Sequence, residues 1–343
     1  GKLGRYRFDA MLSSFKVDSK RFQLLHRFKN ADAITNIVDD GAKVVSADVI
    51  NAPVGLNNQR IPEDTDSLLT SLRADWKLTP AWSADAQIGF LRIESERFRE
   101  VYKFRPDGFN IGYDVSERFN PEFRYNNISF EEIVNSPELF DEFDEFVLEP
   151  RDSEDETLRF EANTRYEFSS SMISSVMAGA QYQERTKKSI ESKLKGDSNT
   201  QPLTDFREGG IGLPGNDDFI DGRQPWFGNV LAPFDNLREG IFPGGFVNVP
   251  PNLFESFDVE EEVTSLYVRA DYAIGSRVTG NVGNRVVITD FTSNGFENVN
   301  GNIAPVSFGD DYVQNLPSGT MNIALRDDLV LRGSGGRAMI KPQ

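Results

Sequence analysis

The stretch "VTGNVGNRVVITDF", residues 278–291, alternates between two chemical characters. One alternate set is mainly apolar and comprises Val278, Gly280, Val282, Asn284, Val286 and Ile288. The other set is mainly polar, with a charge in its middle, and comprises Thr279, Asn281, Gly283, Arg285, Val287 and Thr289. Because successive side chains of a strand point to opposite faces of a sheet, the stretch predicts a strand with one apolar and one polar face.

Three other stretches alternate in the same way. They are "SLLTSLRADWKLTP" at 67–80, "TLRFEANTRYEFSS" at 157–170 and "TSLYVRADYAIG" at 264–275. Each alternation runs over about ten residues, whereas an ordinary strand has about 5–6. Strands that cross a bilayer at a tilt need about 9–11 residues. The lengths therefore predict strands that cross a membrane.

The polar faces carry charges that a dry core does not accommodate. In residues 157–168 the polar set includes Arg159, Glu161 and Arg165, facing away from Leu158 and Phe160. Burying such groups unpaired costs several kcal/mol per ion. We therefore expect the apolar face to meet lipid and the polar face a water-filled lumen. A large soluble sandwich with its charged faces outside is the alternative.

Short and long connections alternate along the chain. Predicted strands 66–78 and 82–99, 157–168 and 173–190, 261–274 and 278–292, and 318–325 and 329–340 are joined by three or four residues each. The connections between these pairs are expected at 19–65, 100–156, 191–260 and 293–317. In an antiparallel meander all short turns then lie at one end, as in outer-membrane barrels with short periplasmic turns and long extracellular loops.

The composition excludes several classes of function. Lys and Arg number 37 against 54 Asp and Glu, and a net charge of −17 argues against a general nucleic-acid binder. The chain has no cysteine, and His26 is its only histidine, which disfavours thiol chemistry, metal sites and a Ser-His-Asp triad. We predict no cofactor, no metal and no enzymatic activity. The sequence contains no run of about 18 apolar residues, so it predicts no transmembrane helix.

The connection at 100–156 contains patterns typical of short helices. Ser129 and Glu132 have capping-box spacing. Ser136 and Pro137 are placed as N-cap and first helical residue, and apolar residues follow at helical spacing: Leu139, Phe140, Phe143, Phe146 and Val147. Residues 131–156 hold twelve acids and one base. A solvated outer surface and a site for a divalent cation or cationic ligand both remain open, although no EF-hand spacing is present.

The segment "YVQNLPSGTMNIALRDDLVLRGSGGRAMIKP", residues 312–342, resembles TonB-dependent outer-membrane receptors. The family commonly has a Leu-Pro-Ser motif entering a strand, matched by residues 316–318. A tight turn and a "DDLVLR" strand follow it, matched by residues 327–332. The preceding hairpin is similar at "GNVGNR", residues 280–285. The resemblance is sharpest to the long receptors of Xanthomonas- and Caulobacter-like bacteria and is most specific over 260–342.

This resemblance implies a receptor for energised nutrient uptake in the outer membrane of a Gram-negative bacterium. The implied partners are outer-membrane lipid, a small nutrient and the TonB complex acting through a plug. The ligand class is an oligosaccharide by preference, with an iron chelate possible. Plug, TonB box and final strands are not visible in the sequence, and about nine strands are counted against 22 in complete plugged transporters. We therefore expect residues 1–343 to be part of one transmembrane β-barrel domain.

One loop offers candidate ligand-binding residues. "DFIDGRQPWFGN", residues 218–229, contains a possible sugar platform made of Asp221, Arg223, Gln224, Trp226 and Phe227. A tryptophan that anchors its own loop is the alternative, and it is the simpler explanation of the pattern. Trp76 and Trp82 flank a short turn and fit an interfacial aromatic girdle.

Two other functions remain open. A passive porin has the same type of wall and no plug. A secreted, β-rich glycan-binding or glycan-active protein would use acid pairs such as Asp217 and Asp218. Adjacency in sequence does not establish the ~5–9 Å carboxylate separation that glycoside hydrolysis needs.

Overall fold

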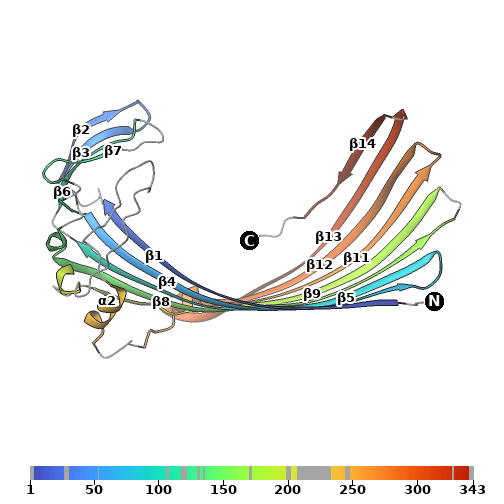
Figure 1. The fold of residues 1–343 in the computed structure, drawn as a ribbon, viewed down its shortest axis with the longest axis horizontal. Coiled ribbons are helices and arrows are strands. Elements are labelled where there is room, and N and C mark those ends of the chain that lie inside the picture. Colours follow the sequence, from blue (N-terminus) through green and yellow to red (C-terminus); the bar gives the residue numbers. More distant parts are fainter. Residues whose placement is uncertain are drawn as a thin grey trace.

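The protein forms one long curved sheet with a smaller sheet and short helices at one end (Figure 1). The computed structural model describes residues 4–26, 31–52, 54–105, 108–116, 122–129, 132–133, 136–169, 172–197, 202–206, 233–243, 248–326 and 328–339. Within these residues no helix is long and apolar enough to span a bilayer.

Nine strands follow one another through the long sheet in chain order. They are β1 (Gly4–His26), β4 (Val54–Lys77), β5 (Trp82–Arg105), β8 (Glu142–Glu167), β9 (Ile173–Glu191), β11 (Phe257–Ile274), β12 (Val278–Val299), β13 (Asn302–Arg326) and β14 (Leu329–Gly336). All neighbours are antiparallel, and β10 (Leu194–Asp197) adds to β8. Within the described residues the sheet is open, since β1 and β14 are each paired on one side. The expected up-and-down meander and its strand count are confirmed.

The two ends of the sheet differ as the loop lengths predict. The short turns that leave β4, β8, β11 and β13 lie together at one end (Figure 1). Long connections follow β1, β5 and β9 at the other end, which we call the loop end. All eight strands predicted from alternation exist, and most extend well beyond the predicted bounds toward the loop end.

The long connection expected at 293–317 is wrong. Strands β12 and β13 pair continuously and are joined by a two-residue turn, Asn300–Gly301. Asn300 has φ 54° and Gly301 φ 88°, and the Gly301 N–H donates to the Asn298 side chain at 2.7 Å. Positive φ at both central residues matches the twist of a hairpin, and Asn-Gly is the dipeptide that adopts it most readily. The sequence signal was therefore present in "NG".

A second sheet of four strands stands at the loop end. Its order is β2 (Ala33–Asp39), β3 (Val44–Ala52), β6 (Phe109–Asp114) and β7 (Glu122–Tyr125). The first two strands come from the β1–β4 connection and the last two from the β5–β8 connection. Short helices complete this end: η2 (Pro137–Leu139), η3 (Leu203–Phe206), α2 (Phe234–Ile241) and η4 (Leu253–Glu255).

The long strands and these connections share one hydrophobic core, which we call the cap core. Leu56 of β4, Tyr102 and Phe104 of β5 and Leu148 of β8 are fully buried in it. Connection residues that complete it include Ile111, Phe140, Leu203, Phe206, Phe234 and Leu237. Phe104 and Phe206 meet edge to face at 5.7 Å. The long strands therefore project beyond the predicted membrane span and serve as the floor of an extracellular domain.

The helix expected to begin at Ser136 and Pro137 and to run through Val147 is confirmed only at its start and is wrong beyond it. Only η2 forms, and residues from Glu142 onward continue strand β8 in register with β5. Phe143 packs on Phe104, while Glu145 pairs with Lys103 and Lys195 from the flanking strands β5 and β10. Cross-strand partners thus override the local helical spacing. The capping expected at Ser129 is present, because its Oγ accepts the Glu132 N–H at 3.0 Å.

The strand register pairs the apolar positions of each strand with the apolar positions of its neighbours, so each face of the sheet keeps one character. Phe8, Leu72, Ile88, Phe160 and Tyr182 stand opposite one another on successive strands and form one row of the apolar face. Side chains of this face are exposed, for example Leu266 at 56% and Val313 at 62%. On the polar face the small side chains are covered, for example Ser265 at 3% and Thr289 at 0%, whereas long charged side chains such as Arg159 and Arg269 are about half exposed. Side chains converge on the inside of a curved sheet, so the polar face is the inner one.

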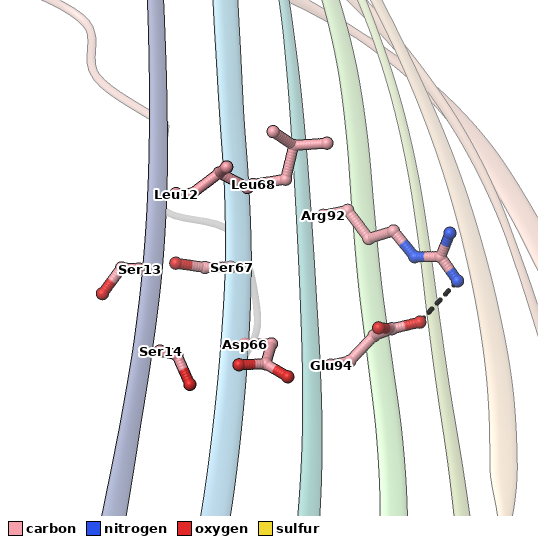
Figure 2. A pocket seen from close by; sticks show the side chains of 8 residues that line it. All are labelled: Leu12, Ser13, Ser14, Asp66, Ser67, Leu68, Arg92 and Glu94. Atoms are coloured by element: carbon pink, nitrogen blue, oxygen red, sulfur yellow. Dashed lines mark hydrogen bonds and ion pairs between the residues drawn. The ribbon is translucent and has the colours of Figure 1, made fainter.

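Figure 2 shows where the apolar face ends toward the loop end. Leu12 and Leu68 lie opposite each other, and Ser14 and Asp66 form the next row. Arg92 there pairs with three carboxylates, those of Glu94 at 2.5 Å, Glu154 at 2.7 Å and Glu156 at 3.3 Å. The apolar band between this border and the short turns is the part of the sheet that we assign to lipid.

Arginine substitution at neighbouring positions of β5 tests which face meets lipid. Ile88→Arg places a charge in the apolar band and is expected to destabilise the bilayer-embedded protein by about 2–4 kcal/mol. Gln87→Arg, one residue earlier on the polar face, is the matched control and should cost little, since Glu161 stands opposite. Urea unfolding in lipid vesicles measures both. Equal costs at the two positions would contradict the assignment of faces.

Candidate functional site

The inner face carries a network of paired charges and hydrogen-bonding groups that we take as the candidate solute passage. Its members come from β4, β5, β8, β9, β11 and β12, and they are Arg73, Asp75, Asp85, Arg159, Glu161, Asn163, Arg165, Ser175, Tyr267, Arg269, Asp271 and Arg285. Strand alternation places all of them on one side of the sheet. We call this set the inner-face network.

Asn163 is the centre of the network. Its amide nitrogen donates to Asp85 at 2.9 Å and to Glu161 at 3.1 Å. Its amide oxygen accepts the Tyr267 hydroxyl at 2.6 Å, and the Arg285 guanidinium lies 5.2 Å from the centre of the Tyr267 ring. One amide therefore links strands β5, β8 and β11, with β12 reached through a cation–π contact.

A second group gathers around Asp271. Ser175 donates to it at 2.7 Å, Arg269 pairs with it at 2.6 Å, and Arg165 lies 3.8 Å away. Basic and acidic side chains alternate along the inner face. A polar solute therefore meets hydrogen-bond donors, hydrogen-bond acceptors and charges of both signs. Among the described residues no group of three or more His, Asp or Glu is arranged to hold a metal ion.

The inner face continues above the membrane band as a ladder of ion pairs. Lys103–Glu145–Lys195 and Arg99–Glu149–Lys193 each place a carboxylate of β8 between two bases. Burial alone raises the pKa of Glu149, but hydrogen bonds from Lys193 and Arg99 bring its pKa below the ordinary value. The carboxylates of residues 131–156 were expected on a solvated surface or in a cation site. Those of Glu145 and Glu149 instead form ion pairs with basic side chains of the protein.

The five predicted ligand residues, Asp221, Arg223, Gln224, Trp226 and Phe227, lie outside the described residues. The acid pair Asp217 and Asp218 lies in the same segment. Trp82 stands opposite Tyr166 beside the short-turn end, and its indole N–H donates to Thr164 at 2.6 Å. That position suits the predicted aromatic girdle.

Sequence reasoning identified Arg159, Glu161 and Arg165 as lumen-facing but not the role of Asn163 as a hub. A hub depends on which strands are neighbours and in which register, and neither is local information. The sequence feature that could have indicated this contact is Gly179. A Cβ at Gly179, opposite Asn163, would lie 2.3 Å from the Asn163 Oδ1 and 2.5 Å from the Tyr267 ring. Gly179 therefore makes room for the Tyr267–Asn163 contact.

Alanine substitution of two inner-face glycines tests the network. Gly179→Ala displaces Tyr267 or Asn163 and should destabilise the protein by about 1–3 kcal/mol through overpacking. Gly89→Ala on β5 is the matched control, since its Cβ would approach nothing closer than 3.8 Å, and it should change stability by about 0.5 kcal/mol or less. Thermal unfolding in detergent gives both values. A Gly179→Ala protein as stable as the control would rule out the tight hub.

Comparison with known proteins identifies the family. The family model described as TonB dependent receptor-like, beta-barrel matches residues 93–343, well over half of the chain. No curated protein matches the sequence. Structural similarity is found to the siderophore receptor PiuA from Acinetobacter baumannii, with 9% identity, 95% of this chain and 47% of that chain covered, and a TM-score of 0.34.

Two further structures resemble the chain to the same extent. The ferric yersiniabactin uptake receptor FyuA from Yersinia pestis has 9% identity, coverage of 96% of this chain and 45% of that chain, and a TM-score of 0.33. The ferric citrate transporter FecA in its unliganded form has 11% identity, coverage of 97% and 44%, and a TM-score of 0.31.

This chain spans less than half the length of the structures it matches. The family model, the antiparallel order of the strands and the two faces of each strand all indicate part of a β-barrel wall. The family consists of Gram-negative outer-membrane receptors rather than enzymes. The chain belongs to the TonB-dependent receptor β-barrel family.

Proposed function

We propose that the protein is an outer-membrane receptor that imports a scarce nutrient with energy supplied through TonB. The described strands form part of the barrel wall, the inner-face network lines the route of the nutrient, and the loop end receives it from outside. The single observation that carries the proposal is the two-faced sheet: an exposed apolar band on one side and paired charges on the other. A wall of this kind separates lipid from an aqueous interior.

In this proposal residues 1–343 are part of one barrel domain whose plug and remaining strands belong to the rest of the receptor. TonB acts on the plug, so none of the described residues performs energy coupling. The inner-face network supplies hydrogen bonds that a polar solute exchanges one after another, because charges such as Arg159 and Arg269 are already paired with Glu161 and Asp271.

Two nutrient classes remain candidates. The platform Asp221, Arg223, Gln224, Trp226 and Phe227 supports an oligosaccharide. An iron chelate is the other class, since the three similar solved structures are a siderophore receptor, a ferric yersiniabactin uptake receptor and a ferric citrate transporter. A passive porin is the second candidate function, favoured by the hydrated inner face alone. Dependence on TonB separates the receptor from the porin.

Uptake assays in matched strains test the proposal. The full-length gene is expressed in a Gram-negative host lacking its own receptors, with and without a tonB deletion. Growth is measured on limiting oligosaccharide panels and on limiting iron with ferric chelate panels. Growth on one panel that needs both the receptor and TonB is expected. Uptake that persists without TonB identifies a porin, and recovery of the protein in the soluble fraction contradicts both functions.

A further inference from the structure

A buried carboxylate on the outer side of the wall, above the lipid band, has no role in the proposed passage. Glu100 of β5 is 0% exposed and lies on the same face as Ile88 and Phe104, not on the inner face. Figure 1 shows α2 against this outer, convex side of the sheet at the loop end. Burying a carboxylate is costly, whereas apolar side chains of similar volume often give equal or greater stability. The presence of Glu100 therefore indicates a purpose other than stability.

Two arginines from different elements face this carboxylate. The Arg238 guanidinium of α2 donates to one oxygen of Glu100 at 2.7 Å, and the Tyr102 hydroxyl donates to the other at 2.9 Å. Arg60 of β4 lies 3.7 Å from Glu100 and donates two hydrogen bonds, of 2.9 and 3.1 Å, to Asp18 of β1. The ion pair of α2 is therefore made to a group that β1, β4 and β5 hold in place.

Aromatic packing also joins α2 to the wall. Phe234 lies on Tyr102 with ring centres 6.2 Å apart, and Phe242, at the end of the helix, meets Phe146 of β8 at 4.9 Å. Apolar contacts are non-directional, and a helix as short as α2, with eight residues, has little stability of its own. A buried ion pair is directional, because its hydrogen bonds require one geometry. The ion pair can therefore select one position of α2 among several that bury the same rings.

The position of α2 extends to the rest of its connection. This connection joins β9 to β11, spans residues 192–256 and also contains the predicted platform at 221–227. Within it the Asn236 amide donates to the Phe206 carbonyl of η3 at 3.1 Å, and a Cβ on Gly240 would lie 2.5 Å from the Phe206 ring. With α2 and η3 in such close contact, a shift of α2 along the wall displaces η3 as well.

We propose that Glu100 is a positioning residue for nutrient binding: its ion pair with Arg238 fixes α2, and with it the β9–β11 connection, in the arrangement that binds the nutrient. Buried polar groups fix register in this way in coiled coils, at a cost in stability. The inference rests on the proposed function, because it assigns this connection to nutrient binding. Glu100 itself touches no nutrient and acts through α2.

Two variants of the full-length receptor separate position from stability. Glu100→Gln keeps an acceptor for the Tyr102 hydroxyl but removes the carboxylate from the buried Arg238 charge. The double variant, Glu100→Gln with Arg238→Met, removes that charge as well and should melt close to the wild-type temperature. Asp235→Asn is the matched control, because Asp235 pairs with the same arginine at 3.6 Å but is 78% exposed.

The distance between two spin labels in lipid vesicles measures the position of α2. This chain has no cysteine, so Glu96→Cys on β5 and Glu239→Cys on α2, both at exposed positions, supply the labelling sites. We expect one narrow distance distribution in the wild type and in Asp235→Asn, and a broad or shifted one in both Glu100 variants. A wild-type distribution in either Glu100 variant overturns the proposal, and so does equal broadening in Asp235→Asn.

Uptake kinetics test the link to the nutrient. The probe is the radiolabelled compound of the oligosaccharide or ferric-chelate panel on which wild-type cells show TonB-dependent growth. The double variant should raise the concentration for half-maximal uptake about tenfold and leave the maximal rate unchanged, because affinity depends on a pre-arranged site. An unchanged half-maximal concentration refutes the inference and leaves the proposed function standing. Absence of TonB-dependent uptake by the wild type refutes the proposed function, whereas the label distances still decide whether the ion pair fixes α2.

Discussion

The structure depends on the requirement that every backbone polar group inside a bilayer find a partner within the protein. From β1 to β14 the antiparallel strands meet it through continuous ladders, such as the unbroken register of β1 with β4 from Gly4 to His26, whereas the outer edges of β1 and β14 have no partner strand within the described residues. A break in the band would expose unpaired N–H and C=O groups to hydrocarbon. The register shifts of the long sheet lie at Lys103/Phe104 of β5, Asp271/Tyr272 of β11 and Ala324/Arg326 of β13, near the ends of these strands.

The same ladders also support the extracellular part. Tyr102 and Phe104 occupy the alternate positions of β5 that include Ile88, so the face that meets lipid lower down becomes the floor of the cap core. The fully buried Glu100 lies between them and the band. Arg238 of α2 donates to it at 2.7 Å and Tyr102 at 2.9 Å, which pairs a charge that burial would otherwise penalise. One strand face thus changes its environment from lipid to protein.

Period-two alternation was enough to predict the strand class, the two faces and the ends of the sheet. Arg159, Glu161 and Arg165 lie on the inner face, as the alternation required. The same rule failed where its signal is weaker than a non-local contact: residues 139–147 have helical spacing, yet Phe104 and Lys103 on β5 draw them into a strand. The second sheet joins two connections far apart in sequence, and the inner-face hub at Asn163 needs the register of three strands. Neither is present in local sequence.

Accessibility along β11 tests the central claim most directly, and the absence of native cysteine makes single labelling sites simple to introduce. Nitroxide labels are placed one at a time at residues 264–270 of the full-length receptor in lipid vesicles. Collisions with oxygen should peak at Leu266 and Val268, and collisions with a water-soluble nickel chelate should peak at Arg269, whose side chain is exposed on the polar face. The opposite phase, or nickel access at every position, would contradict a wall with lipid on one side and water on the other.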